Sequence, residues 1–224
     1  MITFHPEHDL LCQFVAAELP ASLSAAISMH AELCPKCAKE IEQLTFLASE
    51  QFSQVDTQED TSISQTDYSD LNIDDMINAI CSDIATDTPV VSELPQVEIK
   101  GQVYSLPRAL RSTSMSGWYK MGKLSRARID LNEGALHASL LHIDKEGSVP
   151  QHTHKGFELT LLLEGSFKDE MGTYVKGDFI MLDGEHTHNP ITEKGCLCFT
   201  VADDALHFTQ GFSKLLNPLG SFIY

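Results

Sequence analysis

The chain has 224 residues, 42% of them hydrophobic, so it has room for one large domain or two modest ones with a packed core. Its formal net charge of −17 argues against direct binding to nucleic acid or to an anionic membrane, because both need clustered Lys and Arg. The acidity favours a basic partner protein, or serves solubility alone. No stretch approaches the ~20 apolar residues of a membrane-spanning helix, and the first residues lack a signal-peptide pattern, so we expect a cytoplasmic protein.

Apolar residues recur at helical spacing through the first fifty positions. The pattern predicts three helices, over residues 7–19, 23–33 and 38–52. Pro20 ends the first helix, and Ser22 is a candidate N-cap for the second.

A set of metal-ligand residues lies where the second predicted helix meets the third. His30, Cys34 and Cys37 are spaced at i, i+4 and i+7, so they share one face of a helical segment. A structural zinc site needs four N or S ligands, and the fourth could come from His5, His8 or Cys12. The Cys-Pro-Lys-Cys motif could also be a thioredoxin-like redox site, but that site follows a strand, whereas a helical pattern precedes it here.

This segment resembles the HxxxCxxC signature of zinc-binding anti-sigma factors, in which a short helical domain binds an extracytoplasmic-function sigma factor. The resemblance implies a further histidine ligand near the N-terminus. His5 fits that place best, because Pro6 holds it extended before the first helix, and His8 is its rival one turn later.

The next zone is acidic, with no Lys or Arg between Gln51 and Pro95. Residues 53–70 contain few apolar positions and predict a solvated linker. Residues 71–86 predict a fourth, amphipathic helix with Asp74 and Asp75 in its first turns. We therefore expect a helical domain over residues 1–86 and a linker over 87–96.

From residue 97 onward the pattern changes to short alternating segments broken by Gly, Asn and Asp. Strands are expected over residues 135–143, 158–163, 166–170, 178–182 and 197–201. Such spacing predicts an all-β sandwich or barrel over residues 97–224.

A second set of metal-ligand residues lies in this β region. His152 and His154 are two apart, so on a strand both point to the same side, and Glu158 follows a short turn. Residues 147–165 resemble the first cupin motif and residues 177–189 the second. The second motif departs from the usual pattern, with Asp183 in place of Pro and Gly184 one place early, which leaves His186 and His188 as competitors.

The cupin resemblance implies a ligand set of His152, His154, Glu158 and His188. Three imidazoles and one carboxylate suit zinc, iron, manganese or nickel, so the donors leave the metal open. Cys196 and Cys198 follow on a predicted strand, where they are either a buried pair or an oxidisable pair close to the metal. Cys12 and Cys81 are expected to be core residues.

Taken together, the two metal sets, with residues 106–111 leading into the barrel, resemble the ChrR-type anti-sigma factors. The resemblance implies a two-domain α plus all-β protein, with a zinc-stabilised helical domain followed by a jelly-roll cupin barrel. It implies a non-enzymatic regulator that holds an extracytoplasmic-function sigma factor inactive through its helical domain. The cupin domain would release that factor under singlet oxygen or oxidative stress. The alternative is a metal-dependent cupin dioxygenase or isomerase with a helical appendage.

Overall fold

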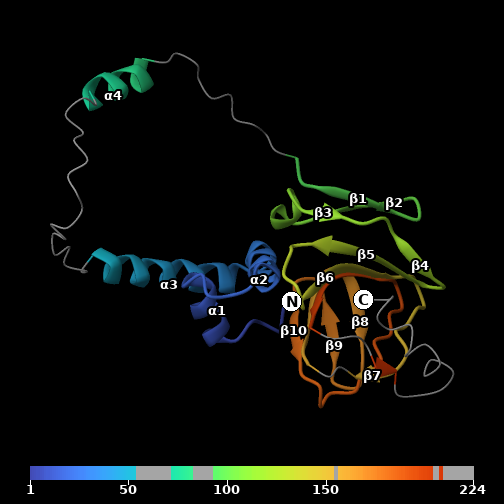
Figure 1. The fold of residues 1–224 in the computed structure, drawn as a ribbon. Helices are drawn as coiled ribbons and strands as arrows, with labels where there is room; N and C mark the ends of the chain where they lie inside the picture. The colour runs from blue at the N-terminus through green and yellow to red at the C-terminus, as the bar shows by residue number, and fades with distance from the viewer. Residues whose placement is uncertain (54–71, 83–92, 154–155, 204–206, 209–224) are drawn as a thin grey trace. The chain divides into compact units, whose positions relative to one another are not determined.

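The computed structural model describes residues 1–53, 72–82, 93–153, 156–203 and 207–208. The chain forms two compact units, one of Met1–Ala48 with Leu94–Tyr224 and the other of Ser49–Glu93 (Figure 1). In the described part of the chain, the helices are too short or too polar to cross a membrane. The domain boundaries at 86 and 97 stay predictions; the first strand begins at Gln96.

The described residues of the N-terminal half form four helices, as the apolar periodicity predicts. They are α1 (His8–Val15), α2 (Ala21–Leu33), α3 (Pro35–Ser53) and α4 (Ile73–Ser82). The expected end of the first helix at residue 19 is wrong, because Ala17 has a φ of 58° and this left-handed residue stops the helix. The third helix starts earlier than expected, since Pro35 favours a first helical turn.

Ser22 is not the N-cap of α2. The helix begins at Ala21, with Pro20 as its cap residue, so Ser22 lies inside the first turn. Its backbone N–H donates to the Glu133 carboxylate at 2.9 Å. The Glu133 carboxylate therefore accepts a hydrogen bond that a capping side chain would otherwise accept. The physical cause of the error is a partner 111 residues away in the chain.

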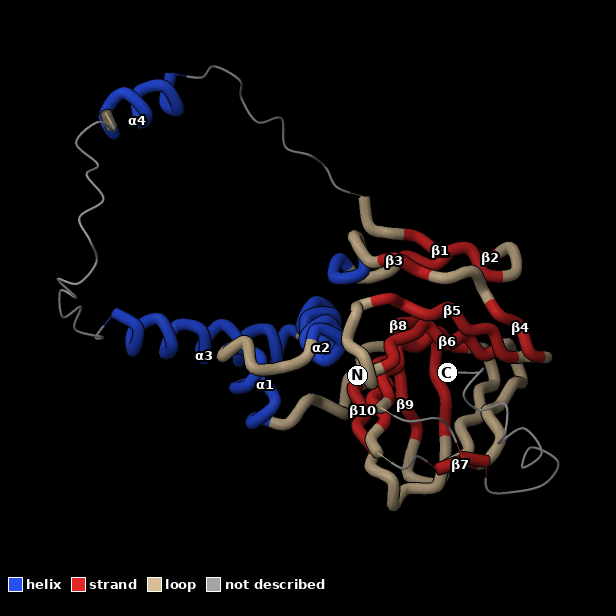
Figure 2. Tube along the Cα trace, viewed as in Figure 1, coloured by secondary structure: helices blue, strands red, loops and turns tan. Residues whose placement is uncertain are grey.

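The C-terminal half is a set of antiparallel strands (Figure 2). The main eight-stranded sheet has the order β10-β8-β11-β6-β5-β3, with β4 on β5 and β9 on β8. The two strands β1 and β2 form a separate hairpin, and β7 pairs with β12. The predicted combination of a helical N-terminal part with a cupin-type sheet is confirmed. The strands are β1 (Gln96–Ile99), β2 (Gln102–Ser105), β3 (Ser114–Met115), β4 (Tyr119–Met121), β5 (Leu124–Asp130), β6 (His137–Ile143), β7 (His152–Thr153), β8 (Glu158–Lys168), β9 (Thr173–Val175), β10 (Phe179–Leu182), β11 (Cys196–Ala202) and β12 (His207–Phe208).

The segments expected over 158–163 and 166–170 are one continuous strand, β8. Gly165 does not end the strand. Its φ is +80°, and its backbone passes so close to Gly195 that a Cβ on residue 165 would lie 2.1 Å from the Gly195 carbonyl oxygen. Pairing then continues, with Ser166 opposite Val175.

Each face of this sheet has its own core. Leu159 and Leu161 of β8 point to a cluster that they share with Leu11, Ile27 and other residues of α1 and α2. Alternate positions, among them Leu162 of β8 and Cys198 of β11, belong to an interior cluster with Ile180 and Phe167. The N-terminal helices therefore share a hydrophobic core with the outer face of the sheet.

Candidate metal centres

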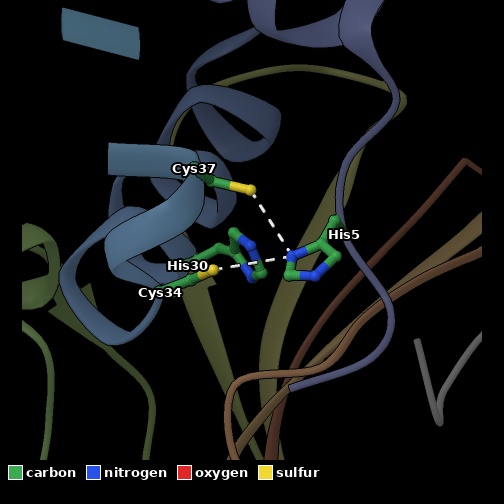
Figure 3. Close-up of side chains that lie close together, drawn as sticks. All are labelled: His5, His30, Cys34 and Cys37. Atoms are coloured by element: carbon green, nitrogen blue, oxygen red, sulfur yellow. Dashed lines mark hydrogen bonds between the residues drawn. The ribbon is translucent and has the colours of Figure 1, made fainter. Parts of the chain in front are cut away.

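Four side chains from the N-terminal part converge on one point (Figure 3). His5 precedes α1, His30 lies in the last turn of α2, Cys34 separates α2 from α3, and Cys37 lies in the first turn of α3. One ligand atom of each lies within 4.8 Å of the others. The Nδ1 atom of His5 is 3.5 Å from the sulfur of Cys34 and 3.5 Å from the sulfur of Cys37. We call these four residues the N-terminal cluster.

The local backbone explains why Cys34 and Cys37 face the same point. Cys34 is extended, with φ −120° and ψ 99°, and its N–H donates to the His30 carbonyl at 2.7 Å. Its own carbonyl accepts from Ala38, so α3 starts immediately after it. Cys34 is thus a one-residue connection between α2 and α3, and the ligand residues lie where the two helices meet.

His30 has the arrangement of a metal-binding histidine. Its Nδ1 donates to the backbone carbonyl of Gly177 at 2.8 Å, which leaves Nε2 as the nitrogen with a lone pair. Nε2 is buried and has no hydrogen-bond partner among the described residues. Histidine ligands characteristically donate their other ring N–H to a carbonyl or carboxylate in this way.

The protonation states within the cluster fit a cation. Burial, with Lys36 adding to the effect on His5, lowers the pKa of both His5 and His30, so each imidazole is neutral at pH 7. Burial and the neighbouring Cys34 raise the pKa of the Cys37 thiol to about 12. A divalent cation would reverse the pKa change at Cys37 by stabilising the thiolates. Two sulfur and two imidazole donors are a zinc donor set.

The rival ligands occupy a different place. His8 is exposed, and its Nδ1 lies 2.8 Å from the Glu40 carboxylate, while its Nε2 lies 3.5 Å from the sulfur of Cys12. Within the described residues, the group around His30 therefore contains His5 and neither His8 nor Cys12.

A second cluster, which we call the cupin cluster, lies inside the sheet. It consists of His152 of β7, Glu158 at the start of β8, and His188 after β10, all buried. The Nε2 atoms of His152 and His188 are 2.9 Å apart, and His188 Nε2 is 3.3 Å from Glu158 Oε2. The Nδ1 of His152 donates to the Pro150 carbonyl at 2.8 Å, which turns Nε2 toward the cluster. The predicted ligand His154 lies outside the described residues.

The structure brings His188, not His186, to the cupin cluster. His186 is exposed and pairs with Asp183, the residue that replaces the usual proline of the motif, at 2.6 Å. Burial alone would lower the pKa of His188, but the nearby carboxylates of Glu158 and Asp169 raise it. Such a concentration of buried carboxylate and imidazole suits a divalent cation.

Asp169 was not predicted from the sequence. Its side chain is 1% exposed, and its Oδ2 lies 3.5 Å from His188 Nδ1. Its other oxygen accepts the N–H groups of Met171 and Gly172 in the β8–β9 turn. The run Asp169–Gly172 signals a turn, but no local pattern shows that the carboxylate reaches a histidine nineteen residues later.

The cupin cluster opens onto a mainly apolar cavity. Its lining includes Leu141, Ile143, Phe167 and Ile180, with Arg126 and Thr160 among its polar groups. Cys198 also lines it, and both Cys196 and Cys198 are buried in the interior core.

The four cysteines outside the N-terminal cluster lie in three environments. A hydrogen bond with Cys196, together with burial, raises the pKa of the Cys198 thiol, which favours its less reactive protonated form. Cys12 is half-buried. The expectation that Cys81 is a core residue is wrong, because every described side chain of α4 is exposed.

Comparison with known proteins agrees with this geometry. Residues 108–205 match the family model of the ChrR cupin-like domain. Over 97% of both chains, the protein is 28% identical to the anti-sigma-E factor ChrR of Cereibacter sphaeroides. The resemblance to ChrR-type anti-sigma factors is confirmed.

The fold of the ChrR-type proteins extends beyond the cupin domain. The structure of Rhodobacter sphaeroides SigE in complex with the anti-sigma ChrR matches 91% of this chain and all of that chain, with a TM-score of 0.63 and 24% identity. The similarity to ChrR therefore includes the helical part that carries the N-terminal cluster as well as the barrel that carries the cupin cluster.

Proposed function

We propose that this chain is a zinc-dependent anti-sigma factor that binds an extracytoplasmic-function sigma factor and keeps it from RNA polymerase in the cytoplasm. The observation that carries the proposal is the N-terminal cluster, built by His5, His30, Cys34 and Cys37 in a chain that is similar to ChrR from end to end. The HxxxCxxC spacing at this cluster, which resembles the signature of zinc-binding anti-sigma factors, supports the proposal.

Zinc would be held by the two thiolates, by His30 through Nε2, and by His5. Its contribution is structural: four ligands from the N-terminal segment, α2 and α3 would fix how these elements meet. Apolar packing alone holds α3 less firmly than α2. Among the described residues of α3, Cys37 is the one fully buried apolar side chain, and Ile41 and Leu44 are partly buried against the core of α1, α2 and the sheet.

The surfaces of the helices support binding to another protein. In the distal half of α3, Phe46 and Leu47 are exposed, and Phe52 is 81% exposed. In α4, Ile73, Met76, Ile77 and Ile80 are all exposed as well. Apolar side chains of this size at a helix surface mark an interaction site. The net charge of −17 complements the basic surfaces with which sigma factors approach DNA.

The cupin domain would supply the response to singlet oxygen or another oxidative signal. The proposed ligands are His152, His154, Glu158 and His188, and a divalent metal held there would offer a Lewis-acidic centre at the floor of an apolar cavity. Cys196 and Cys198 remain candidates for oxidation. On this proposal the cavity serves sensing, so the chain is not an enzyme.

The experiment that tests the proposal compares Cys34→Ser with Cys12→Ser in the full chain, each co-expressed with extracytoplasmic-function sigma factors. Cys34 belongs to the N-terminal cluster and Cys12 does not. We expect C34S to lose both zinc and sigma binding, and C12S to keep both. Equal sigma recovery with the two variants would contradict a zinc-dependent anti-sigma factor. Turnover of a small carbonyl substrate by the metal-loaded wild type, without sigma binding, would favour the cupin enzyme.

A further inference from the structure

Two residues of the turn between β9 and β10 lie next to the N-terminal cluster. Gly177 contacts His30 of the cluster, and Asp178 contacts the segment that precedes His5. Asp178 is fully buried, and its carboxylate accepts three backbone hydrogen bonds. Oδ1 accepts from Thr3 at 2.7 Å and from Phe4 at 3.0 Å, and Oδ2 accepts from Val175 at 2.7 Å. A buried carboxylate with several N–H donors fixes those donors firmly, because charge-assisted hydrogen bonds are strong.

The segment that precedes α1 is thereby fixed along β10 (Figure 1). The N–H of Phe179 donates to the carbonyl of Phe4 at 3.1 Å, and the ring of Phe4 packs on that of Tyr174 at a centroid distance of 4.8 Å. His5 is the next residue in the chain. Its position in the cluster therefore depends on a barrel residue, Asp178, that holds the two preceding amides.

The second histidine depends on the same turn. The Nδ1 of His30 donates to the carbonyl of Gly177, 147 positions later in the sequence. Gly177 has a φ of +94°, and a Cβ there would lie 2.4 Å from Cδ1 of Ile2. The left-handed conformation favours glycine, so the carbonyl that orients His30 is built into the turn.

We propose that Gly177 and Asp178 are positioning residues of the zinc site, so that the cupin barrel completes the metal centre of the helical part. Gly177 sets the tautomer and direction of His30, and Asp178 sets the position of His5. Zinc affinity is then a property of the full chain. By thermodynamic reciprocity, zinc bound at the N-terminal cluster also stabilises the barrel. The inference deepens the proposed function and rests on it, since it assumes that the cluster binds zinc.

The most selective test changes Thr3, because its side chain is exposed and only its backbone N–H reaches Asp178. Thr3→Pro removes that N–H, whereas Thr3→Ala keeps it and serves as the matched control. Zinc affinity of the full-length protein is measured by competition with a chromophoric chelator. Loss of an outer-shell partner typically costs about 10-fold to 100-fold in metal affinity, and we expect T3P to bind zinc at least about 10-fold more weakly than T3A.

Cobalt substitution separates a displaced ligand from general destabilisation. A Co²⁺ ion with two sulfur and two imidazole ligands has visible absorption bands that change when an imidazole is replaced by water. We expect T3P to shift these bands and T3A to leave them unchanged. Asp178→Asn, which places an amide opposite the donor of Val175, should weaken zinc binding further.

Two results would overturn the inference. The first is equal zinc affinity and equal cobalt spectra for T3P and T3A. This result overturns the inference even if D178N fails to fold. The second is zinc addition that leaves the thermal unfolding midpoint of the wild-type barrel unchanged. A wild-type protein that takes up no zinc would instead contradict the proposed metal site, so the failures of the inference and of the proposed function are distinguishable.

Discussion

The two nitrogens of one imidazole have separate tasks in each metal cluster. In His30, Nδ1 donates to a carbonyl and Nε2 faces the thiols; in His152, Nδ1 donates to the Pro150 carbonyl and Nε2 faces His188. In both cases a backbone carbonyl selects the tautomer before any ion binds. This preorganisation favours metal binding, because the donors need little rearrangement.

At this scale the choice between His188 and His186 can be tested directly. His188 is buried against Glu158, whereas His186 is exposed and contacts Asp183. We expect His188→Ala to lower the metal content of the barrel and to block oxidant-triggered release of the sigma factor, while sigma binding persists. His186→Ala is the control and should retain metal and response.

Metal analysis of each purified variant, combined with sigma recovery before and after exposure to singlet oxygen, measures the difference. Loss of sigma binding by H188A before any oxidant would contradict the division of labour between helices and barrel. A normal response by H188A would remove the cupin cluster from the sensing mechanism.

The predictability of individual residues from sequence depended on how local their partners are. Two ligand sets were predictable because the members of each lie close together in the sequence: His30 with Cys34 and Cys37, and His152 with Glu158. Asp169, Gly177 and Asp178 were not, because the groups they serve are brought to them by tertiary packing. The capping of α2 failed as a prediction for the same reason, since Glu133 takes the place of Ser22.

Among the elements, α4 has the clearest amphipathic pattern and no described partner. Asn72 begins it, its side chain accepting the Asp75 N–H at 3.2 Å, and Asp74 and Asp75 in the first turn suit the positive end of the helix dipole. Its apolar side chains, Ile77 and Ile80 among them, are exposed. Such a stripe either completes the chain's own core or contacts a partner protein.

Ile77 lies within the apolar stripe of α4, and its neighbour Asn78 lies outside the stripe. Ile77→Asp places a charge in the apolar stripe, and Asn78→Asp places the same charge outside it. If the stripe contacts the sigma factor, I77D should weaken binding by at least about 30-fold, which corresponds to the roughly 2 kcal/mol of an interface hot spot, and N78D should change it little. Binding is measured by calorimetry, with thermal unfolding of both variants as the control.

A different outcome would assign α4 to the fold of the chain itself. Equal sigma affinity for I77D and N78D, with a lowered unfolding midpoint for I77D, would show that the stripe stabilises the chain and not the complex.

Helix and strand types were predictable because amphipathic periods of 3.6 and 2 residues are properties of the sequence alone. The boundaries of the elements were harder to predict. Ala17 ends α1 through a left-handed conformation, and β8 continues through Gly165, where the glycine suggested a break. Both depend on contacts that only the folded chain supplies.

In the whole molecule, β10 joins the two metal clusters. Gly177 and Asp178 precede it beside the N-terminal cluster, and its last residue, Leu182, pairs with Glu158 of the cupin cluster. Four strand residues span about 13 Å. A change in ligand geometry at Glu158 or His188 therefore has a short covalent and hydrogen-bonded connection to the carbonyl that orients His30. Such a connection would let chemistry in the barrel alter the helices that bind the sigma factor.

Co-purification of the full chain with candidate extracytoplasmic-function sigma factors, followed by zinc analysis of the recovered complex, decides whether the chain is a zinc-dependent anti-sigma factor. We expect a one-to-one complex with one zinc at the N-terminal cluster, and loss of the sigma factor when a chelator removes that zinc. Recovery of no sigma factor, or a complex that persists unchanged after the zinc has been removed, would contradict this function.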